Sequence, residues 1–110
     1  MFQLTGKVVV ITGAASGIGA ALAAALAEKG ARLMLADIDT AGLDLLQRSL
    51  RAKGCDCHTS VTDTGNEAAL HALAAETQAR LGPADVVINN AGSHWLPRWS
   101  ACAATMRIGS

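Results

Sequence analysis

The chain has 110 residues, nine Lys and Arg against nine Asp and Glu, and a formal net charge of zero. A chain of this length forms one domain, and its balanced charge favours neither nucleic acid nor an anionic membrane as a partner, so a small molecule is expected. The apolar runs are too short to span a bilayer, no signal-peptide pattern is predicted, and three cysteines give no even disulfide framework, which together predict a cytoplasmic protein.

The first predicted unit is a strand over Lys7–Thr12, a glycine-rich turn, and a helix over Ser16–Lys29. Gly13 is expected to permit a sharp turn, Gly17 to leave room for an anion, and Gly19 to let the helix lie close to the strand. Free N–H groups and the helix dipole favour an anion at the first helical turn, which predicts a pyrophosphate site. The alternative is that the glycines serve only the turn. A P-loop is excluded because no Gly-Lys-Ser/Thr follows.

A second buried strand, Arg32–Ala36, ends at Asp37, eighteen residues after the last glycine of that turn. An acid at about this separation accepts hydrogen bonds from the adenosine ribose of a bound dinucleotide. Its charge would repel a 2′-phosphate, and Ala15, Ser16 and Ile38 offer no compensating positive charge. NAD is therefore favoured over NADP. The alternative is a merely solvated carboxylate at the strand end.

The rest of the pattern alternates helices with strands. It predicts two more helices, over 40–53 and 64–81, and two more strands, Cys57–Thr62 and Val86–Ile88. Thr40 and a capping box over Thr64–Glu67 are the expected helix starts. Right-handed crossovers then give an α/β, doubly wound parallel sheet of about four strands in the order 3-2-1-4 with three helices, and a crevice at the carboxyl ends of the strands.

Cys55, Cys57 and His58 could suggest a metal site. On a strand, however, residues 55 and 57 face one way and 58 the other, so the three side chains do not converge. Buried thiols on a core strand are the preferred interpretation. No metal site is predicted.

Residues 4–92 resemble the amino-terminal part of the classical short-chain dehydrogenases/reductases, which have a Rossmann-like fold. The matching motifs, in chain order, are T-G-A-A-S-G-I-G at 12–19, the acid at 37, D-T-G-N-E-A-A-L at 63–70, and N-N-A-G at 89–92. The resemblance implies that Ser16 and Ile18 help hold the pyrophosphate. It also implies that Asp63 and the Thr64 backbone contact the adenine, while Asn90 lies near the nicotinamide ribose. The full predicted NAD site is Gly13, Ser16, Gly17, Ile18, Gly19, Asp37, Asp63, Thr64 and Asn90.

The resemblance implies hydride transfer between the nicotinamide and an alcohol or ketone, with a Tyr of a Y-x-x-x-K motif exchanging the proton. This chain has no tyrosine, and its lysines, at 7, 29 and 53, all precede the third strand. That Lys is needed because an unperturbed phenol is a poor base at neutral pH. No catalytic residue is predicted. Two functions stay open: a short-chain oxidoreductase acting on a small-molecule substrate if a full-length form exists, or a non-catalytic NAD-binding half-domain or inactive truncated product.

After residue 92 the family pattern is lost. We expect residues 1–92 to form a partial dinucleotide-binding domain and 93–110 to be an atypical tail, as in a truncated or out-of-frame continuation of a longer enzyme. A substitute site built from His94, Trp95 and Trp99 is the alternative. The strand Val86–Ile88 would then lie at an apolar edge of the sheet, which predicts self-association unless the tail covers it.

Overall fold

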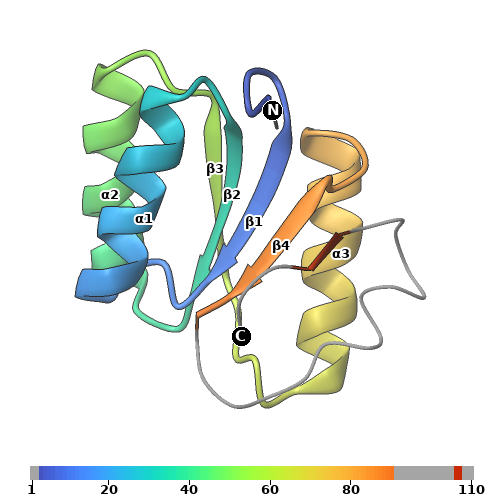
Figure 1. Ribbon diagram of the computed structural model, residues 1–110. Helices are drawn as coiled ribbons and strands as arrows, with labels where there is room; N and C mark the ends of the chain where they lie inside the picture. Colours follow the sequence, from blue (N-terminus) through green and yellow to red (C-terminus); the bar gives the residue numbers. More distant parts are fainter. Residues whose placement is uncertain (1–2, 91–105, 108–110) are drawn as a thin grey trace.

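The computed structural model describes residues 3–90 and 106–107. A parallel sheet separates two layers of helices, with α1 and α2 on one face and α3 on the other (Figure 1). In chain order the elements are β1 (Val8–Thr12), α1 (Gly17–Glu28), β2 (Arg32–Asp37), α2 (Thr40–Ala52), β3 (Cys57–Val61), α3 (Glu67–Arg80), β4 (Val86–Asn89) and β5 (Met106–Arg107). No helix among the described residues is both long and apolar enough to cross a membrane.

The strand order is β3-β2-β1-β4-β5, and every pairing is parallel. The predicted order 3-2-1-4 and the doubly wound α/β fold are therefore confirmed, with a fifth strand added. β5 pairs Met106 with Val86 and Arg107 with Val87. The expectation that β4 is an edge is wrong along that stretch, because β5 pairs with it. The sequence does not predict β5, since main-chain pairing by two residues needs no alternation of side chains that a pattern would show. Nothing in the described residues tests the domain boundary at 92.

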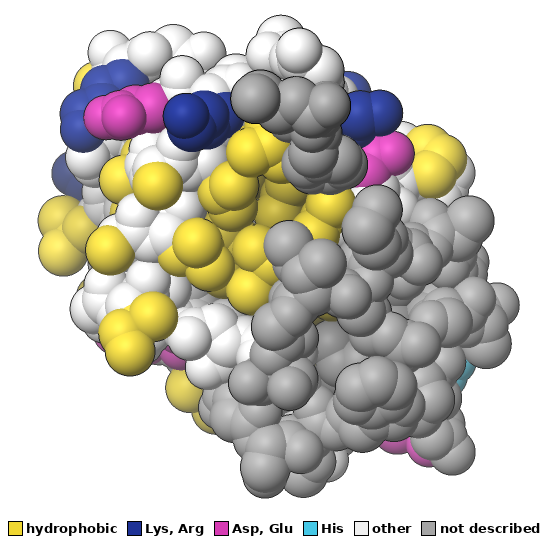
Figure 2. Space-filling view, in the orientation of Figure 1, with side chains coloured by type: hydrophobic (Ala, Val, Ile, Leu, Met, Phe, Trp, Pro, Cys, Tyr) yellow, Lys and Arg dark blue, Asp and Glu magenta, His cyan; other side chains and the backbone are white. Residues whose placement is uncertain are grey.

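Side chains alternate between the two faces of the sheet, and each face is buried under helices. Val9, Ile11, Leu33 and Leu35 pack on the side of α1 and α2. Their strand neighbours Val8, Val10, Met34 and Ala36 pack on the side of α3. In the space-filling view hydrophobic side chains gather beside α1, over the part of the sheet that holds β1 and β4 (Figure 2). Burial on both faces explains why these strands read as continuous apolar runs.

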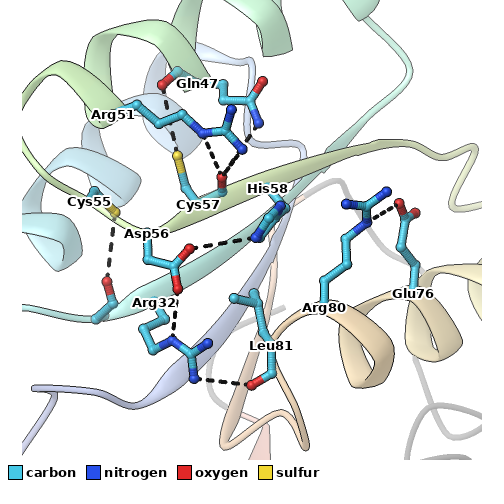
Figure 3. Close-up of polar contacts among 11 residues, drawn as sticks. Arg32, Gln47, Arg51, Cys55, Asp56, Cys57, His58, Glu76, Arg80 and Leu81 are labelled. Carbon is cyan, nitrogen blue, oxygen red and sulfur yellow. Dashed lines mark hydrogen bonds and ion pairs between the residues drawn. The ribbon is translucent and has the colours of Figure 1, made fainter.

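The amino-terminal edge of the sheet carries a polar cluster (Figure 3). Arg32 Nε lies 3.0 Å from Asp56 Oδ2, and its Nη1 donates to the Leu81 carbonyl at 3.1 Å. His58 Nε2 lies 3.5 Å from Asp56 Oδ1. These contacts join β2 and β3 to the end of α3, on the edge opposite to the predicted crevice. Half-exposed ion pairs of this kind add little stability.

Two predicted helix caps are wrong, although α2 begins at Thr40 as predicted. The N-cap of α2 is Asp39, not Thr40, and its Oδ1 accepts from Gly42 N at 3.0 Å. The N-cap of α3 is Asn66, not Thr64, and its Oδ1 accepts from Ala69 N at 2.9 Å. Asx side chains at these positions reach the free N–H groups, so they provide the caps that the threonines were expected to provide.

Cys57 is buried on β3 and Cys55 is half-buried just before it. Their sulfurs lie near main-chain carbonyls, with Cys57 Sγ 3.8 Å from the Gln47 oxygen and Cys55 Sγ 3.7 Å from the Ala31 oxygen (Figure 3). Burial raises the pKa of Cys55 from 9.0 to about 11 and also raises the pKa of Cys57. The part of the chain that the structure describes holds no group of three His, Cys, Asp or Glu side chains placed to bind a metal ion. Cys102 lies outside the described residues.

Candidate functional site

The carboxyl ends of the strands meet at one edge of the sheet. The register pairs Thr12 with Ala36 and with Asn89, and Asp37 with Val61. The segments that follow these strands therefore converge. They enclose a pocket of about 290 Å³ lined by Gly13, Ser16, Asp37, Ile38, Thr62, Asp63, Thr64 and Asn90. Six of these eight residues belong to the predicted site, and Gly17, Ile18 and Gly19 are the predicted residues that do not line the pocket.

Gly13 makes the turn between β1 and α1. Its φ of +67° is in the left-handed region, where a side chain would strain the backbone. Its carbonyl oxygen accepts from Ser16 N at 3.2 Å and from Ser16 Oγ at 2.8 Å. Ser16 is also the N-cap of α1, and its Oγ accepts from Gly19 N at 3.1 Å. One serine side chain therefore joins the turn to the first turn of the helix.

The other two glycines have different surroundings. A Cβ added to Gly19 would collide with the carbonyl oxygen of Gly13 and lie 2.9 Å from the Ala14 Cα, so the helix and its preceding turn touch through this missing side chain. A Cβ added to Gly17 would meet no atom within 4 Å. Gly19 therefore serves internal packing, while Gly17 leaves open space at the start of α1. Ile18, between them, is 75% exposed.

Asn90, the residue that follows β4, is hydrogen-bonded to the turn through its side-chain amide. Its Nδ2 donates to the Gly13 carbonyl at 3.2 Å and to Ser16 Oγ at 3.1 Å. One residue earlier, the Asn89 Oδ1 accepts from the buried Thr12 Oγ1 at 2.8 Å. These bonds join β1 and β4, which are the two strands between which the chain order reverses. In open α/β sheets this reversal point is where ligands bind.

Asp37 joins the turn to β2 on the other side. Its Oδ2 accepts from Ala15 N at 2.9 Å, and its Oδ1 accepts from Asp39 N at 2.9 Å. The carboxylate is half-buried at the pocket wall. Two main-chain donors therefore fix the orientation of this negative charge before any ligand arrives.

The far end of the pocket is formed after β3. Thr62 is buried, and its N–H donates to the Asp37 carbonyl at 2.9 Å. Asp63 Oδ1 accepts from Gly65 N at 2.9 Å, which shapes the short turn that contains Thr64. Thr62 and Ile38 line the pocket but were not among the predicted residues. The available signal was position, since each lies at or just beyond the carboxyl end of a strand.

The sequence is similar to those of known dehydrogenases. A family model described as short chain dehydrogenase matches residues 7–106. Over 94 residues the chain is 47% identical to 1-deoxy-11-beta-hydroxypentalenate dehydrogenase of Streptomyces avermitilis, covering 83% of this chain and 35% of that protein. It is 44% identical over 93 residues to L-fucose dehydrogenase of Oryctolagus cuniculus, covering 84% of this chain and 31% of that protein.

Solved structures of short-chain dehydrogenases are also similar to this chain. A short chain dehydrogenase/reductase from Burkholderia phymatum in complex with NAD superimposes with a TM-score of 0.78 and 40% identity, over 80% of this chain and 31% of that one. A metagenomic short-chain oxidoreductase in complex with NADP gives 0.77 and 38%, over 87% and 43%. The chain spans about a third of the length of the curated relatives described above. The match over residues 7–106 shows that the chain belongs to the short-chain dehydrogenase family.

Proposed function

We propose that the chain binds NAD in the pocket at the carboxyl edge of the sheet. The observation that carries this proposal is the convergence of the glycine turn, Asp37 and the segment after β3 on one pocket at the reversal point of the strand order. Its volume of about 290 Å³ is at the lower end for ligand pockets, so it suits the adenosine part of a dinucleotide. The diphosphate would then lie over the open space at Gly17, near the N-terminus of α1.

The residues around the pocket support specific roles. Ser16 and the main chain near Gly17 and Ile18 would contact the diphosphate, with Gly13 and Gly19 shaping the turn that holds them. Asp37 would accept from the adenosine ribose hydroxyls, and Asp63 with the Thr64 backbone would contact the adenine. Asn90 would hold the turn in place near the nicotinamide ribose. Bound NAD supplies the hydride acceptor, and the contribution of these side chains is to bind and orient it.

The preference for NAD over NADP rests on charge. The solved relatives described above bind NAD in one case and NADP in the other, so family membership does not decide the choice. Two carboxylates, Asp37 and Asp63, and no Lys or Arg line the pocket among the described residues. Because Asp37 is fixed by two N–H donors, it cannot easily turn away from a 2′-phosphate. Repulsion between these like charges disfavours NADP.

Two proposals for the activity follow from the family. In the first, the chain is part of a cytoplasmic oxidoreductase that transfers hydride between NAD and an alcohol or ketone. In the second, these 110 residues bind NAD without catalysing a reaction, and the absence of tyrosine from the sequence supports this second proposal. Both share the same cofactor site, so binding is the first property to test.

The test is a fluorescence titration with NADH, followed by turnover assays with a panel of ketones. Asp37→Ala is the informative variant, and Asp44→Ala is its matched control, because Asp44 is an exposed carboxylate on α2 outside the pocket. We expect NADH to bind the wild type and Asp44→Ala equally, and Asp37→Ala about tenfold more weakly. Equal binding by all three proteins contradicts the proposed site. Turnover of any ketone contradicts the non-catalytic proposal.

A further inference from the structure

We propose that Gly42, on α2, is a positioning residue that sets the place of the glycine turn through contact with Ala15. Neither residue lines the pocket. The inference rests on the proposed function, because the consequence of a displaced turn is weaker dinucleotide binding. It adds a role for α2, which otherwise only covers the sheet.

The geometry at Gly42 is unusually close for a helix in contact with a loop. A Cβ added there would lie 2.8 Å from the Ala15 Cβ and 2.6 Å from Asp39 Oδ2. Ordinary contacts between carbon atoms are about 3.5–4.0 Å. Gly42 does not have a positive φ, so its backbone conformation does not require glycine. Glycine is therefore required at position 42 because there is no room for a side chain, although glycine weakens a helix relative to alanine.

The two crowded atoms would respond differently to an added methyl group. The Asp39 carboxylate is the end of a rotatable side chain, so it can turn away at the cost of the N-cap. The Ala15 Cβ has no rotatable bond between it and the main chain, so it moves only with the turn itself. Ala15 N donates to Asp37 Oδ2 at 2.9 Å, and Ser16 follows it directly. A shift of Ala15 therefore reaches two residues that line the pocket.

Three variants of the 110-residue chain separate the two effects. Gly42→Ala disturbs both the turn and the cap, Asp39→Ala removes only the cap, and the double variant Ala15→Gly/Gly42→Ala disturbs the cap but relieves the contact between residues 15 and 42. We expect Gly42→Ala to weaken NADH binding about tenfold, measured by fluorescence titration. Asp39→Ala keeps the main-chain N–H that donates to Asp37, so it should lower the melting temperature while the Kd for NADH stays within about twofold. The double variant should recover most of the affinity without recovering the melting temperature.

The outcomes that overturn the inference are equally specific. Gly42→Ala with wild-type affinity, or a double variant as weak as Gly42→Ala, shows that the contact with Ala15 does not set the site. If Gly42→Ala does not fold, a folded double variant supports the inference and an unfolded one overturns it. Amide NMR shifts of Ala15 and Gly17 report the position of the turn without ligand. They should move in Gly42→Ala but not in Asp39→Ala, even if the wild type fails to bind NADH and the proposed function is wrong.

Discussion

The glycines of the turn between β1 and α1 offer a sharp test of the geometry of this turn, because alanine substitutions two residues apart are expected to have opposite effects on the stability of the fold. In Gly17→Ala the new methyl group meets no atom within 4 Å, and Gly17 does not have a positive φ. Replacing a helical glycine by alanine then stabilises the fold by up to about 1 kcal/mol. The same methyl group occupies the space proposed for the diphosphate, so dinucleotide binding should be lost.

Gly19→Ala is expected to destabilise the fold, whereas Gly17→Ala stabilises it. Its methyl group would collide with the Gly13 carbonyl oxygen and lie 3.0 Å from Asn90 Nδ2. Overpacking of this kind costs about 1–3 kcal/mol, and displacing the Asn90 amide from the Gly13 carbonyl adds about 1 kcal/mol. The sum, about 2–4 kcal/mol, is a large part of the roughly 5–15 kcal/mol that stabilises a typical domain.

Urea unfolding followed by circular dichroism measures both stabilities, and NADH fluorescence measures binding. We expect Gly17→Ala to be at least as stable as the wild type and unable to bind, and Gly19→Ala to be destabilised. If Gly19→Ala unfolds at the wild-type urea concentration, the close contact in the turn is wrong. If Gly17→Ala binds NADH normally, the place proposed for the diphosphate is wrong.

Three further predictions concern the fold. Thr12→Val removes the hydroxyl that donates to Asn89 Oδ1 in a buried site, so urea unfolding should show a loss of about 1–3 kcal/mol, and Thr12→Ser should retain most of it. Leu35→Ala, at a fully buried position, should cost about 2–5 kcal/mol, whereas Leu45→Ala, 65% exposed, should stay within about 0.5 kcal/mol in the same measurement. The native pKa of Cys55 is raised to about 11, so its protonated thiol favours the native state below about pH 9, and this contribution is lost as the pH rises through about 11. The free energy of unfolding should therefore fall less over this pH range in Cys55→Ala than in the wild type. An equal fall in the two proteins would contradict the raised pKa.

The sheet could be predicted from sequence because burial on both faces leaves a strong local signal. The apolar run before Gly13 and the one before Asp37 have no polar face, which is the pattern of central parallel strands. Asp37 and Asn90 could be placed at one edge of the sheet because residues that follow parallel strands share that edge. The order 3-2-1-4 then followed from the handedness of the crossovers.

The details that sequence did not give depend on contacts between distant segments. Thr40 and Asp39 are both good capping residues, and only the path of the chain after β2 selects Asp39. β5 is specified by main-chain pairing with β4, which leaves little trace in two residues. The closeness of Gly42 to Ala15 joins residues 27 positions apart, so no local pattern indicates it. Thr62 lines the pocket because the fold brings the end of β3 to it, and no local sequence pattern indicates this either.

Calorimetric titration of the folded chain with NAD and with NADP is the decisive measurement of dinucleotide binding and of the preference between the two cofactors. We expect one site that binds NAD, and we expect NADP to bind at least about tenfold more weakly because its 2′-phosphate meets the fixed carboxylate of Asp37. Folded protein that binds neither dinucleotide, or that binds NADP more tightly than NAD, would contradict this expectation.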